Sequence, residues 1–122
     1  MKKQRNSIEV KVNLSTLEEL SSGDSNFMKE LINDFVSQVP QYINNLEESI
    51  KKKETEQVFF LTHKLRSPLF LFGITQLEKE FNFVEENLKK LSLDNQEIIE
   101  TLQLIISSSK LALSLVKNLI KS

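Results

Sequence analysis

The sequence predicts an all-α protein: an antiparallel four-helix bundle with a short additional N-terminal helix. The 122 residues include only two glycines and two prolines, which favours a few long helices over many strands and turns. Apolar residues recur at helical spacing, whereas no strand-like alternation recurs. A chain of this length is expected to form one domain over residues 1–122, with residues 1–9 as a flexible N-terminus.

The first helix is predicted over residues 15–20. Ser15 and, three residues later, Glu18 have the spacing of a capping box, in which the two side chains satisfy free backbone amides at a helix start. Asp24, which follows a turn at Gly23, is expected to be the N-cap of the second helix.

The second helix is predicted to be long and to end at the lysines of residues 51–53, which complement the helix dipole. Pro40 lies inside it, so we expect a kink near residues 36–40. Its apolar face consists of Phe27, Leu31, Ile32, Phe35, Val36, Val39, Tyr42, Ile43, Leu46 and Ile50.

Three more helices follow with short connections, as in an antiparallel bundle. The third is predicted over residues 54–72, where Gly73 stops it, and the fourth over residues 75–90. Asp94 is expected to cap the fifth. The inward positions of the last two are Leu77, Phe81, Val84, Leu88, Ile98, Leu102, Ile105, Ala112, Val116 and Leu119.

The third helix has an unusual outward face. At about 100° per residue, one side is a complete core stripe formed by Val58, Leu61, Leu65, Leu69 and Phe72. His63, the only histidine, lies opposite that stripe. It shares the outward face with Phe59, Phe60, Arg66, Ser67, Phe70 and Leu71. Large apolar side chains on a solvent-facing surface indicate a docking surface, although a neighbouring segment covering Phe60 and Leu71 would also explain them.

The rest of the sequence limits the reactions in which His63 could take part. It has no second histidine or cysteine to complete a metal site, and the chain lacks the strand-turn-helix context of Ser-His-Asp nucleophiles. An exposed imidazole can act as a nucleophile toward phosphorus. Arg66, one turn further on, is placed to bind phosphoryl oxygens.

Composition excludes several other functions. The 16 basic and 17 acidic residues leave a net charge of -1, so no strong field favours nucleic acid or an anionic membrane. The absence of cysteine excludes disulfides and thiolate metal sites. No apolar run approaches the roughly 18 residues needed to span a bilayer, and the chain is expected to be cytoplasmic.

The segment around His63 resembles a known signature. The run HKLRS from His63 to Ser67, with Gly73 ten residues after the histidine and Leu77 four further on, is similar to that of histidine phosphotransfer (HPt) domains. That signature is His-x-Leu-Lys-Gly, a spacer, then Gly and Leu. The stretch from Leu14 to Leu46 resembles the helices that precede it, and the resemblance covers about residues 10–90.

The resemblance implies a role for each site residue. His63 would accept a phosphoryl group through Nε2, and Arg66 would replace the phosphoryl-stabilising lysine of the family. Glu85, which follows Val84 where the family has an apolar residue and then Glu or Gln, would hold the imidazole through Nδ1. The expected partners are response-regulator receiver domains or a hybrid histidine kinase. No cofactor is expected, because Mg²⁺ would come from the receiver, and the chain would be a monomer without kinase activity of its own.

Besides Arg66 in place of lysine, two further departures from the family pattern affect the site. Ser67 replaces a glycine that gives a receiver close access to the histidine, which reduces access without blocking it. Pro68 removes the amide that would bond to the carbonyl of Lys64 and is expected to kink the helix just past the site.

Three alternatives remain open from the sequence. The stretch from His63 to Leu69 also resembles the phosphoacceptor box of sensor histidine kinases, His-Glu-Leu-Arg-Thr-Pro-Leu, which would make the chain a dimerisation hairpin. Against this, Lys64 stands where the box has an acidic general base, and the hairpin leaves the helices before residue 50 unexplained. The chain could instead dock a receiver without carrying phosphate, or be a structural bundle in which His63 has no function.

Overall fold

The structure is a computed structural model, and it describes residues 8–121. Within this part of the chain all regular secondary structure is helical, as predicted. The elements in chain order are α1 (Ser15–Ser21), α2 (Ser25–Lys51), α3 (Thr55–Leu71), α4 (Glu78–Asn87) and α5 (Gln96–Lys121).

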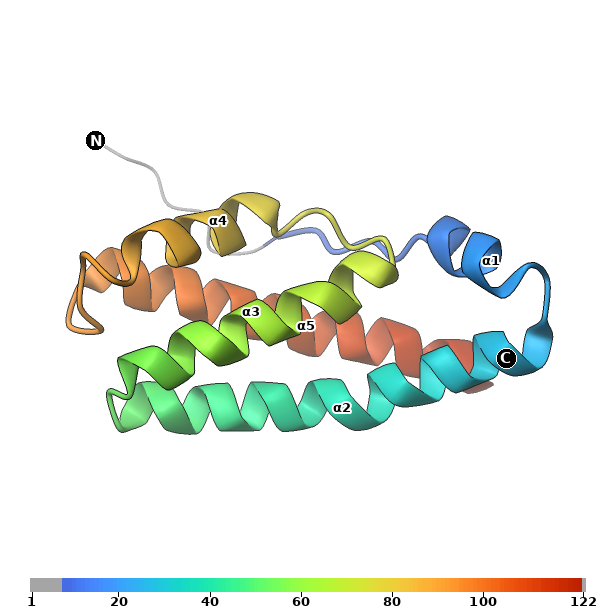
Figure 1. Cartoon of the computed structure of the whole chain (residues 1–122), viewed down its shortest axis with the longest axis horizontal. Coiled ribbons are helices and arrows are strands. Elements are labelled where there is room, and N and C mark those ends of the chain that lie inside the picture. Colours follow the sequence, from blue (N-terminus) through green and yellow to red (C-terminus); the bar gives the residue numbers. More distant parts are fainter. Residues whose placement is uncertain (1–7, 122) are drawn as a thin grey trace.

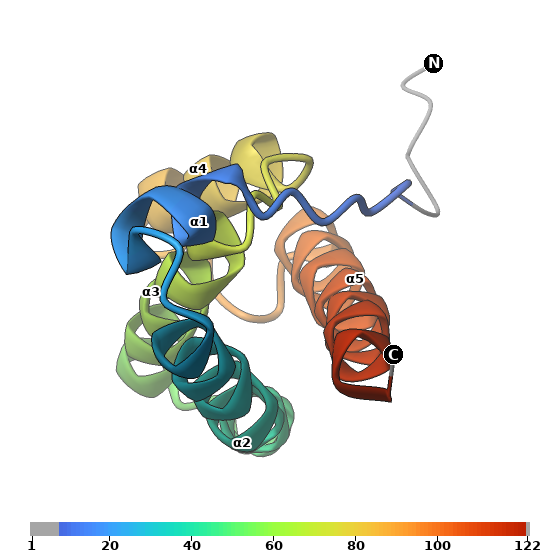
Figure 2. The same cartoon turned by 90° about the vertical axis from the view of Figure 1, so that its right-hand side faces the viewer.

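Helices α2 to α5 form the predicted antiparallel bundle. Each helix runs opposite to the one before it (Figure 1). Helix α2 packs against α3 and α5, and α4 packs against the same two helices, so the four surround one core, as the end-on view shows (Figure 2). The short helix α1 packs on α2 at one end of the bundle (Figure 1). Most of the predicted inward residues, including Phe35, Leu65 and Phe81, are buried in this core or packed against it. The prediction was wrong for Phe27, which is 40% exposed.

Helix α2 begins and ends where the sequence predicted. The carboxylate of Asp24 accepts hydrogen bonds from the amides of Asn26 and Phe27 at the helix start, which is the predicted N-cap. The helix continues through Pro40 to Lys51. Because proline has no amide hydrogen, it cannot bond to the carbonyl of Val36, and the ribbon of α2 changes direction part-way along its length (Figure 1).

Two predicted helix caps were wrong. Leu14, not Ser15, is the N-cap residue of α1, and no side chain caps this helix end. Ser15 is already inside the first turn, so the capping box does not form, and its amide donates instead to Oδ1 of Asn13. At α5, Oδ1 of Asn95 accepts from the amide of Ile98, whereas Asp94 forms an ion pair with Lys53.

Helix α4 is shorter than the predicted residues 75–90. Its N-cap residue, Leu77, has no side-chain oxygen to accept the free amides, and residues 76–77 form a turn before the helix begins. At the other end, the Asn87 side chain donates to the carbonyl of Phe83 over 2.8 Å. It thereby competes with the backbone amide that bonds to this carbonyl in a helix. The shortening leaves the predicted inward residues of α4 in place.

The segment of residues 8–14, before α1, packs onto the core. Ile8 and Val10 are buried, and the amide of Asn13 donates to the carbonyl of Phe72 over 2.9 Å. The prediction of a flexible stretch over residues 1–9 was therefore wrong for Ile8, because an alternating apolar pattern packs this segment onto the bundle. Residues 1–7 lie outside the described residues.

Helix α5 is long and apolar enough to cross a membrane by length and composition, over Gln96–Leu119, with a mean hydropathy of 1.3. This stretch contains no unbroken apolar run of that length, as expected, but uncharged serines among its apolar residues keep the mean hydropathy high. In the bundle, 44% of this apolar window is buried. Its fully buried apolar residues are Ile98, Leu102, Ile105, Ala112 and Val116.

The turn after α3 depends on Gly73. The amide of Gly73 donates to the carbonyl of Phe70, and that of Ile74 donates to Leu69, which together form a Schellman motif. Gly73 has φ of +74°, a conformation that costs other residues energy. A Cβ atom there would also lie 2.4 Å from the backbone oxygen of Asn13. The N-terminal segment can cross α3 at this point because residue 73 has no side chain.

We therefore expect Gly73→Ala to lower the free energy of unfolding by about 2–4 kcal/mol, from the left-handed conformation and the overlap with Asn13. Gly23→Ala is the matched control, since Gly23 has φ of +81° and nothing within 4 Å of an added Cβ. It should cost about 1 kcal/mol. Urea unfolding of both variants measures the difference, and equal losses would contradict this account of the turn.

Candidate functional site

His63 projects from the middle of α3 into solvent. Its side chain is 66% exposed, while Leu61 and Leu65, two residues to either side, are buried. The whole predicted core stripe of α3 is buried. Because this stripe fixes the rotation of the helix, the opposite face and His63 must point outward, as the sequence predicted.

Glu85 on α4 lies beside the imidazole. Its Oε1 atom is 3.2 Å from Nδ1 of His63, which is the contact that the family resemblance implied. The Glu85 side chain is only 19% exposed, so solvent competes weakly for its carboxylate. When Nδ1 carries the proton, it donates to Glu85 and leaves Nε2, the other ring nitrogen, with a free lone pair.

Arg66 is held against the same carboxylate. Its Nη1 donates to Oε2 of Glu85 over 2.7 Å, and its Nη2 donates to Oδ1 of Asn82 over 2.9 Å. The guanidinium carbon lies 5.2 Å from the ring centre of Phe70 and 5.9 Å from that of Phe81. The structure thus joins Arg66 and Glu85, and in this arrangement the cation faces the carboxylate.

Asn82 was not predicted as a site residue. A polar residue three positions before Glu85 on a helix shares its face, and this spacing was the signal available in the sequence. Nothing about an asparagine alone indicates that it contacts Arg66, because that contact depends on how α3 and α4 pack. The sequence could place Asn82 near Glu85 but could not pair it with Arg66.

The predicted docking residues surround His63 with different exposures. Phe60 is 51% exposed and Ser67 is exposed, whereas Phe59, Phe70 and Leu71 are half-buried. The alternative in which a segment covers Phe60 is therefore wrong. We refer to Phe59, Phe60, Phe70 and Leu71 as the apolar ring. Cations lie over its phenylalanines: Lys64 over Phe60, Lys89 over Phe59 and Arg66 over Phe70.

A groove of about 460 Å³ opens beside His63 between α2 and α3. On the α3 side it is lined by His63 with Lys64 and Ser67 and, further along, Pro68 and Leu71. Helix α3 continues through Pro68 to Leu71, so the proline does not end the helix at the site. From α2 the groove is lined by Leu31, Asp34, Phe35, Gln38 and Tyr42.

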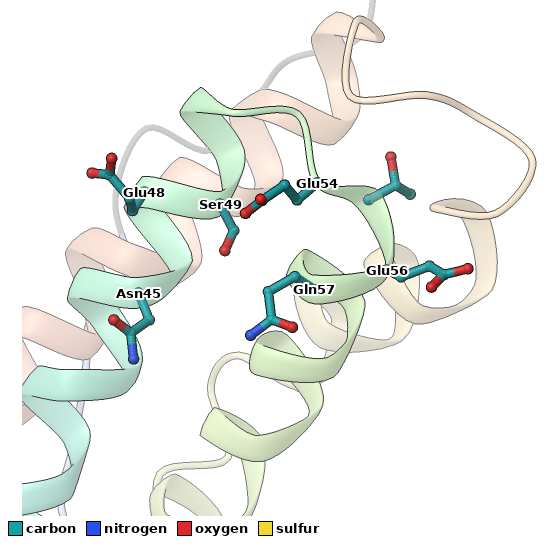
Figure 3. Close-up of a pocket in the computed structure, with 7 residues that line it drawn as sticks. Asn45, Glu48, Ser49, Glu54, Glu56 and Gln57 are labelled. Carbon is teal, nitrogen blue, oxygen red and sulfur yellow. The ribbon is translucent and has the colours of Figure 1, made fainter.

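A larger hollow lies away from His63, at the turn between α2 and α3. It has a volume of about 620 Å³, and polar residues such as Asn45, Glu48 and Gln57 line it (Figure 3). It contains no histidine or cysteine. Among the described residues no group of three or more acidic, histidine or cysteine side chains could hold a metal ion. Size alone therefore does not make this hollow the functional site.

Comparison with known proteins identifies the fold. No sequence-family model matches the chain, and no curated protein matches it. Among solved structures, the chain is similar to the HPt domain of an Hpt sensor hybrid histidine kinase from Shewanella, with a TM-score of 0.72 and 17% sequence identity. The similarity covers 90% of this chain and 93% of that one. This chain has the fold of an HPt domain.

The HPt fold agrees with the resemblance found in the sequence around His63. Identity of 17% establishes the arrangement of the helices, and chemistry must be argued from the side chains themselves. Those side chains are an exposed imidazole, a carboxylate at its Nδ1 and a ring of apolar residues with cations above them.

The contact between His63 and Glu85 leads us to predict which nitrogen of the neutral ring carries the proton. A hydrogen bond to a charged acceptor contributes about 1.5–3 kcal/mol, so the proton should favour Nδ1 over Nε2 by about tenfold or more. Ring ¹⁵N chemical shifts of the neutral imidazole report this directly, because the chain has one histidine. A ring protonated mainly on Nε2 would contradict the geometry.

Glu85→Gln should reduce that preference, because the amide is uncharged and offers one acceptor atom in place of two. Glu86→Gln is the control, since Glu86 is exposed on the same helix and should leave the ring shifts unchanged.

Proposed function

We propose that this chain carries phosphoryl groups in a two-component phosphorelay, transferring them between receiver-domain aspartates through His63. The observation that carries the proposal is the position of the imidazole, 66% exposed with Nδ1 against Glu85, on an HPt fold. This arrangement leaves Nε2 directed away from the carboxylate and open to a partner.

The proposed reaction needs few groups from this chain. The Nε2 lone pair attacks the phosphorus of an aspartyl phosphate, a nitrogen–phosphorus bond forms, and the bond to the aspartate oxygen breaks. The released aspartate takes the electron pair as a carboxylate. The imidazole becomes positively charged, and Glu85 stabilises that charge through the Nδ1 proton. Transfer to a second receiver reverses these steps, so no nucleotide is consumed and the chain needs no kinase activity.

Positioning and charge supply the catalysis, as in other phosphoryl transfers. Glu85 fixes the ring so that Nε2 approaches phosphorus in line, and misplacing a reacting atom by about 1 Å can cost 100-fold in rate. We propose that Arg66, as the cation one turn after His63, stabilises the phosphoryl oxygens. The Mg²⁺ ion belongs to the receiver, and we propose no metal or cofactor for this chain.

The apolar ring is the proposed contact surface for receiver domains. Its exposed Phe60, with Ser67 beside the histidine, suits a small and transient interface of less than about 1,200 Å². The similar domain in Shewanella belongs to a hybrid histidine kinase, and a kinase of this class is the other partner we propose. We place the reaction in the cytoplasm, with the chain acting as a monomer and binding neither nucleic acid nor membrane.

The kinase hairpin is the weaker alternative. A dimerisation hairpin needs a second chain to complete its bundle, whereas α2 to α5 enclose a core within one chain. The docking-only bundle is favoured by one specific feature: both Nη groups of Arg66 are already engaged by Glu85 and Asn82. Phosphate uptake separates that alternative from the relay.

We expect the purified chain to gain one acid-labile phosphate from a receiver domain phosphorylated on its aspartate. His63→Gln should reduce the incorporation to background, because it removes the nucleophile, while the circular dichroism spectrum stays unchanged. Mass spectrometry of the intact chain and its peptides measures both the amount and the position.

The same assay with a small phosphodonor controls for the choice of receiver. Equal phosphate on wild type and His63→Gln would contradict the proposal. Receiver binding without phosphate from either donor would instead establish the docking-only bundle.

A further inference from the structure

The carboxylate of Glu85 is divided between two partners. Its Oε1 contacts Nδ1 of His63 at 3.2 Å, and its Oε2 accepts from Nη1 of Arg66 at 2.7 Å. The arginine contact is the shorter one and carries a permanent charge. Arg66 is therefore the stronger competitor for this carboxylate.

A guanidinium normally pairs with a carboxylate through two parallel hydrogen bonds, one to each oxygen. If Arg66 bound Glu85 in this way, it would occupy Oε1 as well as Oε2. Each carboxylate oxygen can accept more than one hydrogen bond, but a second contact to the guanidinium would draw Oε1 toward Arg66 and weaken its hydrogen bond to Nδ1 of His63. The observed arrangement needs a reason for Arg66 to use only one nitrogen on Glu85.

Asn82 supplies that reason. Its Oδ1 accepts from Nη2 of Arg66 at 2.9 Å, so the second nitrogen is turned away from Glu85. The guanidinium also lies against Phe70 and the buried Phe81, which restricts its rotation. Asn82 and Glu85 are three residues apart on α4, and one face of that helix therefore presents both acceptors to Arg66.

We propose that Asn82 is a positioning residue that prevents Arg66 from taking both oxygens of Glu85 and thereby reserves Oε1 for His63. This inference rests on the proposed function for its consequence, the orientation of Nε2 toward a phosphoryl donor. It concerns the unphosphorylated chain, so it is tested there without any transfer reaction.

The test compares ring ¹⁵N shifts of His63 in four full-length chains: wild type, Asn82→Ala, Arg66→Ala and the double variant. In Asn82→Ala, Nη2 of Arg66 is free to bind Oε1 of Glu85. The ratio of His63 rings protonated on Nδ1 to those protonated on Nε2 should then fall at least threefold. In Arg66→Ala the competitor is gone, so the preference should stay near that of wild type. Adding Arg66→Ala to Asn82→Ala should therefore restore what the asparagine variant lost.

That restoration is the decisive result, because damage to the fold from one substitution would not be repaired by a second. An unchanged preference in Asn82→Ala would overturn the proposal. A double variant as impaired as Asn82→Ala would also overturn it. Asn33→Ala, an exposed asparagine on α2, is the matched control and should leave the shifts unchanged.

A second measurement links the network to transfer. Asn82→Ala should slow phosphate uptake from a phosphorylated receiver by about tenfold, because a misoriented ring reaches the in-line geometry less often. If wild type takes no phosphate, the proposed function fails while the ¹⁵N comparison still decides the role of Asn82. If wild type takes phosphate and the ¹⁵N shifts of Asn82→Ala are unchanged, only the role of Asn82 fails.

Discussion

The burial of one side of α3 is the constraint on which the rest of the site depends. Val58, Leu61, Leu65 and Leu69 are each at most 4% exposed, so the helix cannot rotate without exposing part of the core. That fixed rotation holds His63 in solvent and directs Arg66 toward α4. Because α4 packs against α3, Glu85 meets the imidazole there. One face of α3 thus packs in the core, and the opposite face presents His63 and Arg66 to the site.

The sequence was sufficient where periodicity decides the structure. The outward position of His63 and the inward stripes of α3 to α5 follow from residue spacing and were confirmed. In the stripe predicted for α2, Phe27 is an exception, since it is 40% exposed near the start of the helix. Helix ends were less predictable, because several residues near each end can supply a cap. Asn95 caps α5 although Asp94 has an equally suitable side chain, since Asp94 instead pairs with Lys53 on another turn. Such choices depend on tertiary contacts that no local pattern contains.

The same limit applies within the site. Spacing and resemblance singled out His63 and Arg66 on α3 and Glu85 on α4 as candidate site residues. Two features arise only when α3 and α4 pack together. Arg66 and His63 share one carboxylate, and Arg66 contacts Asn82. Arg66 is therefore held in place by its hydrogen bonds to Glu85 and Asn82. The sequence alone indicated only a cation one turn from the histidine. The planar guanidinium of Arg66 can contact two acceptors at once, which the lysine of the family signature cannot do in the same geometry.

The most direct test of the central claim is to identify which ring nitrogen of His63 binds phosphorus. The phosphorylated chain, labelled with ¹⁵N and observed by ³¹P and ¹⁵N NMR, distinguishes the two attachment sites by one-bond coupling. With Glu85 at Nδ1, the phosphoryl group should be bound to Nε2 alone. Attachment to Nδ1, or to any side chain other than His63, would contradict the account.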